Sequence, residues 1–111
     1  MKLENFNVYQ LSVRLLGDVV RIADRLPRGY AWLRDQTKRA ASSITLNIAE
    51  GLGRASSNEE RRFFDIAIGS AYETAACIDV ARQMNLVSSE LRDRLWDDCD
   101  HITRMLGKMR R

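Results

Sequence analysis

Apolar residues recur at intervals of three and four along most of this chain, and that periodicity restricts the fold more than any other feature. The clearest stripe runs through Phe6, Tyr9, Val13, Leu16, Val20 and Ala23, and a second runs beside it through Leu15, Val19, Ile22 and Leu26. Residues at this spacing share one face of an α-helix. The first segment is therefore predicted to be a helix whose apolar arc is wider than a two-helix seam requires.

Three breaks in the pattern mark where helices end and begin. Pro27 and Gly29 stop the first helix, and Gly51 and Gly53 stop the second. Ser56 or Ser57 offers an N-cap to the third helix, each followed three residues later by a glutamate, and Ser88 or Ser89 offers one to the fourth. These signals predict helices over about residues 6–26, 30–52, 57–84 and 88–109.

The three later helices repeat the apolar periodicity. Their inner faces are predicted to carry Leu33, Ala40, Ile44, Ile48 and Leu52 in the second, Phe63, Ala67, Ala71, Thr74, Ile78 and Ala81 in the third, and Leu91, Leu95, Ile102, Met105, Leu106 and Met109 in the fourth. Short loops between long helices make successive helices antiparallel. We therefore expect residues 1–111 to form one all-α domain, an up-down-up-down antiparallel four-helix bundle. Its surplus of apolar surface predicts an oligomer.

Composition excludes several other classes of protein. One proline and six glycines in 111 residues are too few for a fold of many short strands, and no apolar run reaches the roughly 18 residues of a membrane span. The first residues lack the apolar stretch of a secretory signal, and the two cysteines, Cys77 and Cys99, lack metal-binding or redox spacing. We expect a reduced, cytoplasmic protein with no membrane contact.

Charge is unevenly distributed along the chain. The net charge is +3, but residues 28–54 carry a local +3 and residues 56–85 a local −2. Arginine predominates among the basic residues, and arginine suits both phosphate and carboxylate partners. Solvated helix faces and ion pairs are the default interpretation of such a pattern.

A polar stripe adjoins the inner face of the second helix, where Ser43, Asn47, Glu50 and Arg54 recur at helical spacing. If the second and third helices form a hairpin, facing residue numbers sum to about 112. That register pairs Arg39 with Glu73, Glu50 with Arg61 or Arg62, and Ser43 with Gly69 or Ser70. We interpret the set Arg39, Ser43, Asn47, Glu50 and Glu73 as a structural polar network, with contact to nucleic acid or a partner protein as the alternative.

Enzymatic chemistry finds little support in the sequence. His101 is the only histidine, so the paired Glu-x-x-His motifs of a di-iron bundle cannot be formed. No nucleophile elbow, P-loop or GxGxxG turn is present. We expect no catalytic residues, no metal and no cofactor. A bound metal or a deep pocket lined by Glu50, Glu73 and His101 would revive the enzyme hypothesis.

Aromatic residues at helical spacing are more often core than base-stacking platforms. Phe63, Phe64 and Tyr72 are therefore predicted to be core residues. Trp32 and Trp96 fall less cleanly on inner faces, and two positions suit them, the ends of the core or a subunit interface.

Two longer motifs carry a family resemblance. They are Arg39-Ala-Ala-Ser-Ser-Ile-Thr-Leu-Asn-Ile-Ala-Glu-Gly-Leu-Gly-Arg54, and Phe63-x-x-x-Ala67-x-Gly69-Ser70-x-x-Glu73. With the opening Phe6-Asn-Val-Tyr-Gln10, they resemble the bacterial 23S rRNA-intervening sequence protein family. The resemblance implies a cytoplasmic, non-catalytic four-helix bundle that assembles as a homopentamer. It also implies a likeness to the accessory variability proteins of diversity-generating retroelements, which bind nucleic acid and associate with a reverse transcriptase.

The leading functional hypothesis is a homo-oligomeric accessory protein that binds RNA or DNA with low specificity through phosphates. Its candidate contacts are Arg14, Arg21, Lys38, Arg54, Arg61, Arg62, Arg104, Lys108, Arg110 and Arg111. The alternative is an assembly module whose partner is a protein, such as a reverse transcriptase, without nucleic-acid contact. The alternative gains if Arg39, Arg61 and Arg62 are engaged in intramolecular pairs.

Overall fold

The computed structural model describes residues 2–110, and every secondary-structure element in it is a helix. A single 3-10 turn, η1 (Leu3–Asn5), precedes four α-helices, α1 (Asn7–Asp24), α2 (Ala31–Leu52), α3 (Ser57–Gln83) and α4 (Ser89–Met109). Residues 2–110 contain no strand. The four predicted helices are confirmed, with every boundary within two residues of its expected position.

Serine caps select one of the two alternatives at each start. The Ser56 hydroxyl accepts a hydrogen bond from the Glu59 amide at 3.1 Å, and the Ser88 hydroxyl accepts one from the Leu91 amide at 3.1 Å. In both cases the earlier serine is the N-cap. After α3, Asn85 adopts a φ of 60°, a left-handed conformation that asparagine tolerates, and so turns the chain towards α4.

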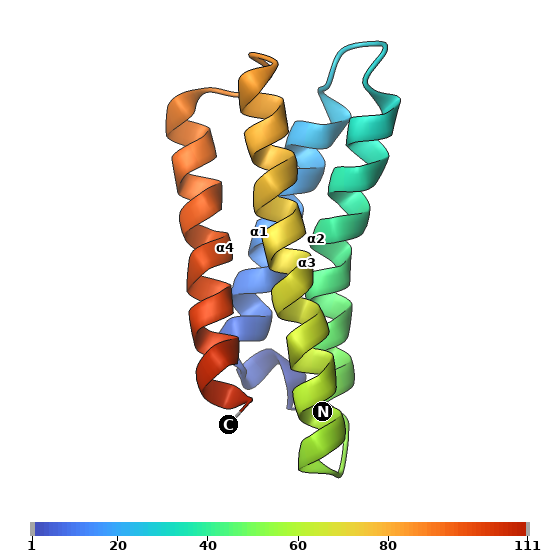
Figure 1. Cartoon of the computed structure of the whole chain (residues 1–111), viewed down its shortest axis with the longest axis vertical. Helices are drawn as coiled ribbons and strands as arrows, with labels where there is room; N and C mark the ends of the chain where they lie inside the picture. The colour runs from blue at the N-terminus through green and yellow to red at the C-terminus, as the bar shows by residue number, and fades with distance from the viewer. Residues whose placement is uncertain (1, 111) are drawn as a thin grey trace.

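Successive helices lie side by side, and the loops that join them lie at alternate ends of the molecule (Figure 1). The closest pairs are α1 with α2, α2 with α3 and α3 with α4, while α1 and α4 close the ring with the sparsest contact. Each helix therefore has two neighbours. The face shared by α1 and α2 lies on the opposite side of the molecule from the face shared by α3 and α4.

The core between the helices is mostly aliphatic and consists of a large cluster and a smaller one around Leu26, Leu33 and Val87. Its fully buried members include Leu15, Ile44, Phe64, Leu95 and Ile102. In α1 the core face is made by Val8, Leu11, Leu15, Val19 and Ala23. The second predicted stripe supplied Leu15 and Val19 and the first supplied Ala23, while Val8 and Leu11 belong to neither predicted stripe. The first stripe is only half covered, with Phe6 and Val13 exposed.

Two further expectations for the core are wrong. Tyr72, predicted to be a core residue, is 70% exposed, because its position on α3 lies beside α4 on the outer surface. Phe63, also predicted to be a core residue, is half-buried, and the guanidinium groups of Arg54 and Arg62 cover its ring at 4.8 and 4.6 Å from the centroid. Leu52 is half-buried too, but it packs against the core as its predicted inner-face position requires. Phe64 is the phenylalanine in the core.

Gly51 allows α2 to approach α3 unusually closely. A Cβ atom at this position would lie 2.6 Å from Cε1 and 2.8 Å from Cδ1 of the buried Phe64 ring. Gly51 thus gives room to the ring and is not merely a helix stop as predicted. The prediction holds for Gly53, which caps the C-terminus of α2.

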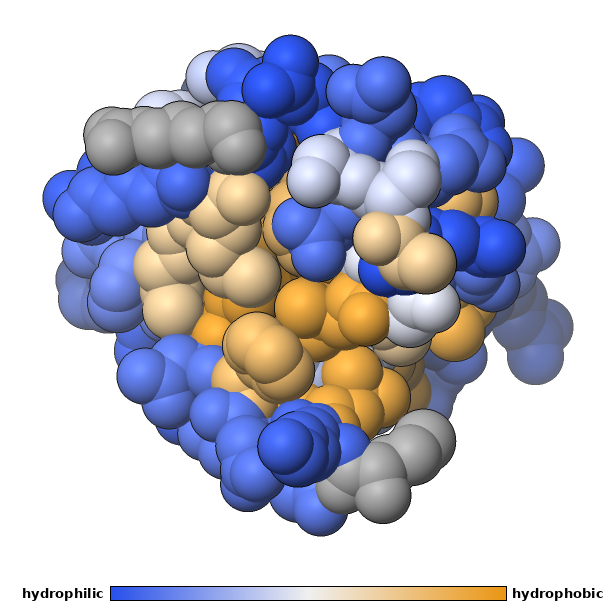
Figure 2. All heavy atoms as spheres, turned by 90° about the horizontal axis from the view of Figure 1, so that it is seen from below, coloured by the Kyte–Doolittle hydropathy of each residue, from blue (hydrophilic) through white to orange (hydrophobic). Residues whose placement is uncertain are grey.

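At the end that holds the α2–α3 turn, the core reaches the surface. Figure 2 views this end and shows apolar side chains gathered at its centre within a hydrophilic rim. None of the helices described over residues 2–110 has the length and apolarity to cross a membrane.

Candidate interaction surfaces

The polar stripe of α2 meets α3 in a hydrogen-bonded network. The Ser43 and Ser70 hydroxyls lie 2.7 Å apart, as one of the two predicted pairings required. Asn47 Nδ2 donates to the Ser43 carbonyl at 2.8 Å and to its hydroxyl at 3.0 Å. Because these groups are part-buried and satisfy one another, they fix the register of α2 against α3.

The charged ends of this stripe pair differently from the prediction. Gln36, not Arg39, contacts Glu73, and Arg39 Nη2 donates to Gln36 Oε1 at 2.8 Å, so the glutamine stands between the predicted partners. Glu50 pairs with Arg54, which follows the C-cap of its own helix, instead of with Arg61 or Arg62. The predicted register considered only residues that face each other across the two helices. It missed these contacts because residues one turn apart along the chain can be nearer to each other than residues on neighbouring helices.

Most of the predicted phosphate-binding residues have an acidic neighbour within the chain. Ion pairs join Arg21 to Asp18, Lys38 to Asp24, Arg54 to Glu50, Arg62 to Glu59, Arg104 to Asp100 and Arg110 to Asp65. Within residues 2–110, Arg14, Arg61 and Lys108 have no ion-pair partner, and Arg61 Nε donates to the Arg110 carbonyl at 2.9 Å. Arg111 lies outside the described residues.

These candidates do not converge on one face. Arg61, Arg62, Lys108 and Arg110 gather where α3 begins and α4 ends, but Arg14 and Arg21 lie on α1. Glu59 and Asp65 offset the charge of the first group. The basic residues thus form a mixed-charge surface in place of the continuous basic strip that a nucleic-acid groove requires.

Exposed apolar residues are better organised. One row of them, here named the α1 stripe, runs along the edge of α1 next to α2 and consists of Phe6, Tyr9, Val13, Leu16 and Val20. Phe6 and Val13 are exposed, and the other three are half-buried. Tyr9 and Leu16 lie one turn either side of Ser12, whose hydroxyl accepts a hydrogen bond from Thr45 of α2 at 3.1 Å. Leu46 of α2 is 64% exposed, and its neighbours on the surface are Ala49, Glu50 and Arg54 instead of the α1 stripe.

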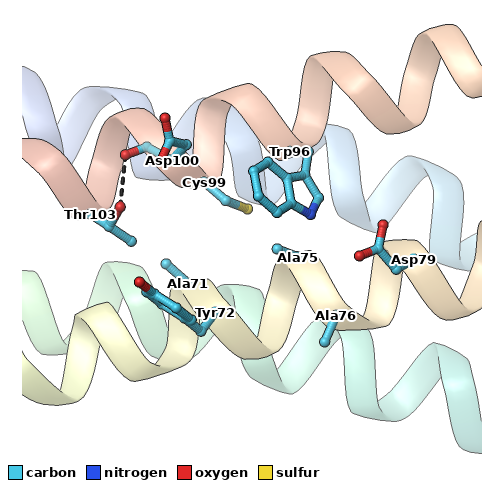
Figure 3. A pocket seen from close by; sticks show the side chains of 9 residues that line it. All are labelled: Ala71, Tyr72, Ala75, Ala76, Asp79, Trp96, Cys99, Asp100 and Thr103. Atoms are coloured by element: carbon cyan, nitrogen blue, oxygen red, sulfur yellow. Dashed lines mark hydrogen bonds between the residues drawn. The ribbon is translucent and has the colours of Figure 1, made fainter.

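The opposite side of the bundle carries a groove of about 210 Å³ between α3 and α4. Its floor consists of the buried Ala71, Ala75 and Cys99, and we name it the α3–α4 groove. Tyr72, Ala76 and Asp79 form the α3 wall, and Trp96, Asp100 and Thr103 form the α4 wall (Figure 3). Tyr72 and Trp96 are both exposed, so the groove presents aromatic surface to solvent.

An arginine holds one wall of the groove in place, and the thiol at its floor is uncharged. Arg92 Nε donates to Asp79 at 2.7 Å and its guanidinium lies 4.9 Å from the Trp96 ring centroid, which fixes the indole against α3. Burial raises the pKa of the Cys99 thiol to about 12, helped by the nearby Asp98 carboxylate. The cysteine is therefore protonated at neutral pH and acts as an apolar group.

Glu50, Glu73 and His101, the residues that could line an enzymatic pocket, do not lie together in the structure. Glu50 lies on α2 beside Leu46, and neither Glu73 nor the exposed His101 lines the α3–α4 groove. Within residues 2–110, no three His, Cys, Asp or Glu side chains lie close enough to hold a metal ion.

The fold and its surfaces define an all-α, four-helix protein with apolar faces on opposite sides. A sequence profile of the 23S rRNA-intervening sequence proteins matches residues 4–108, and the chain belongs to that family. No curated protein sequence matches it. Among solved structures, it is similar to a protein of unknown function from the S23 ribosomal protein family of Bacteroides thetaiotaomicron. That likeness has a TM-score of 0.87 at 20% identity, over 94% of this chain and 98% of the other.

Proposed function

We propose that this protein is a non-catalytic assembly module, an up-down-up-down bundle that functions as a homo-oligomer. The observation that carries the proposal is the ordered exposure of large apolar side chains on two opposite faces. Nine large hydrophobic side chains of residues 2–110 are exposed, four of them on the α1 stripe or in the α3–α4 groove. Single exposed apolar residues are ordinary, but aligned ones mark interaction sites.

Burial of these faces supplies the driving force. Covering apolar surface stabilises an assembly by about 25 cal/mol per Å², and aromatic residues such as Trp96 and Tyr72 contribute strongly to interfaces. The resemblance to the family suggests five copies. A protein partner such as a reverse transcriptase would then bind an outer surface of the assembled ring.

The test is the mass of the wild-type chain by sedimentation equilibrium between about 1 and 100 μM. The proposal predicts a mass that rises with concentration to a fixed multiple of 12.7 kDa. A mass of one chain across the whole range contradicts it.

Nucleic-acid binding is the second candidate. Arg61 and Lys108, which lack ion-pair partners within residues 2–110, lie at the same end of the molecule as Arg62 and Arg110. The pairs in which the other arginines take part are exposed, and exposed pairs contribute only about 0–1 kcal/mol, so phosphate can replace them. Repetition around an oligomer would add avidity to a weak patch.

Mobility shift with RNA and with DNA across a salt series tests this candidate. Phosphate contacts predict a binding constant that falls steeply with salt concentration. The Arg61→Ala, Lys108→Ala double variant should reduce the slope of log binding constant against log salt concentration by about 2, one for each phosphate contact removed. The matched control is the Arg25→Ala, Arg28→Ala double variant, which removes two exposed arginines between α1 and α2, at the other end of the bundle. No binding at about 50 mM salt refutes the candidate.

A further inference from the structure

The two apolar faces differ from each other in shape. The α1 stripe carries large side chains at the three-and-four spacing by which one helix packs against another. Phe6 and Val13 project from it into solvent, while Tyr9 and Leu16 are half-buried against the core and support the ridge from below. The α3–α4 groove is instead hollow, with alanines at its floor and Ala76 exposed on its wall. A ridge of large residues and a groove of small ones are complementary.

The two pairs of helices also differ in net charge. Residues 2–54, which form η1, α1 and α2, contain nine basic and five acidic residues, a net charge of +4. Residues 57–110, which form α3 and α4, contain eight basic and ten acidic residues, a net charge of −2. Association of like halves would bring together net charges of the same sign, whereas association of unlike halves brings together net charges of opposite sign.

We propose that the α1 stripe of one copy packs into the α3–α4 groove of the next, so that copies of this chain associate head to tail. This inference rests on the proposed homo-oligomer and names its contact surfaces. Because the two surfaces lie on opposite sides of the bundle, each copy uses both, one towards each neighbour. Such a heterologous contact builds a ring when its rotation closes and cannot stop at a two-fold dimer.

Two variants block one surface each. Val13→Glu places a charge on the α1 stripe, at a side chain that is 43% exposed, and Ala76→Arg places a long charged side chain at the exposed edge of the α3–α4 groove. Because both positions are exposed, we expect the single bundle to fold with either substitution. Controls at an exposed position outside both surfaces, His101→Glu and His101→Arg, introduce the same charges.

Light scattering of each variant and of their mixture gives the test. Head-to-tail association predicts that each blocked variant alone is a monomer, since its free surface finds no partner. Their equimolar mixture forms a 1:1 heterodimer of about 25 kDa, twice the 12.7 kDa chain, because Ala76→Arg retains the stripe and Val13→Glu retains the groove. The His101 variants keep the wild-type mass.

The outcomes separate the inference from the function on which it rests. Homodimers of the single variants would show that like surfaces pair, and an unassociated mixture would show that the stripe and the groove do not meet. Either result, with an oligomeric wild type, overturns the head-to-tail contact and leaves the oligomer standing. A monomeric wild type overturns both.

Discussion

Replacing Gly51 by alanine tests the packing of α2 on α3. The added Cβ would lie 2.6 and 2.8 Å from two carbons of the Phe64 ring and 3.3 Å from the Glu60 carbonyl oxygen. Carbon atoms in contact sit about 3.5–4.0 Å apart, so the ring or the helix must retreat by about 1 Å. Phe64 is fully buried and cannot swing into solvent. Overpacking of this kind costs about 1–3 kcal/mol.

Alanine also favours the helix over glycine by about 0.5–1 kcal/mol, which offsets part of that cost. The net expectation for Gly51→Ala is a loss of about 1–2 kcal/mol in the free energy of unfolding, or about 4–10 °C in Tm. Urea and thermal unfolding monitored by circular dichroism measure both quantities. All variants must be compared at one protein concentration, because association contributes to apparent stability.

Gly69→Ala is the matched control for this substitution. Gly69 is exposed within α3, and a Cβ at that position would meet nothing within 4 Å. The control should gain about 0.5–1 kcal/mol from helix propensity alone. A Gly51→Ala protein as stable as Gly69→Ala would refute the close approach of α2 to the Phe64 ring.

Three further predictions concern the interior and its edges. Ser43→Ala and Ser70→Ala should each destabilise the fold by about 1 kcal/mol, and a double-mutant cycle in urea should show less than additive loss because the hydroxyls bond to each other. Burial alone would raise the pKa of Asp18, but hydrogen bonds from Arg94 and Arg21 lower it from the ordinary value of 3.8. The ionised Asp18 therefore stabilises the fold at pH values above the ordinary pKa, and this contribution is lost as Asp18 becomes protonated in acid. The stability gap between wild type and Asp18→Asn should therefore close as the pH falls below about 4, and a constant gap in acid titration would contradict the pairing. Cys99 is buried with its pKa raised to about 12, so thiol labelling at pH 8 should require unfolding, and rapid labelling of the native protein would contradict that burial.

The fold was predictable because its determinants are local. Three-and-four spacing, the Pro27 break and the serine caps act within one helical turn, and they placed all four helices. The Ser43–Ser70 contact was also predictable, since a hairpin with a short turn fixes which residues face each other. These features need no knowledge of the rest of the molecule.

Which apolar stripe is buried was not predictable in the same way. The α1 stripe and the core stripe of α1 have equal helical regularity, and only the positions of α2 and α4 decide which one faces inward. The prediction that Tyr72 is a core residue was wrong for the same reason, because the spacing of apolar residues in α3 does not show which of them α4 leaves exposed. Arg39 was misassigned since Gln36, one turn away, reaches Glu73 first.

The most direct test of the account is the accessibility of Trp96 as the protein is diluted. In the single chain its indole is exposed on the wall of the α3–α4 groove, so contact with another copy must cover it. Trp32→Phe leaves Trp96 as the only tryptophan. Acrylamide should quench its fluorescence weakly at about 100 μM protein and several-fold more strongly on dilution to about 0.1 μM. Strong quenching that is the same at every concentration would contradict the claim that copies of this chain cover each other's apolar faces.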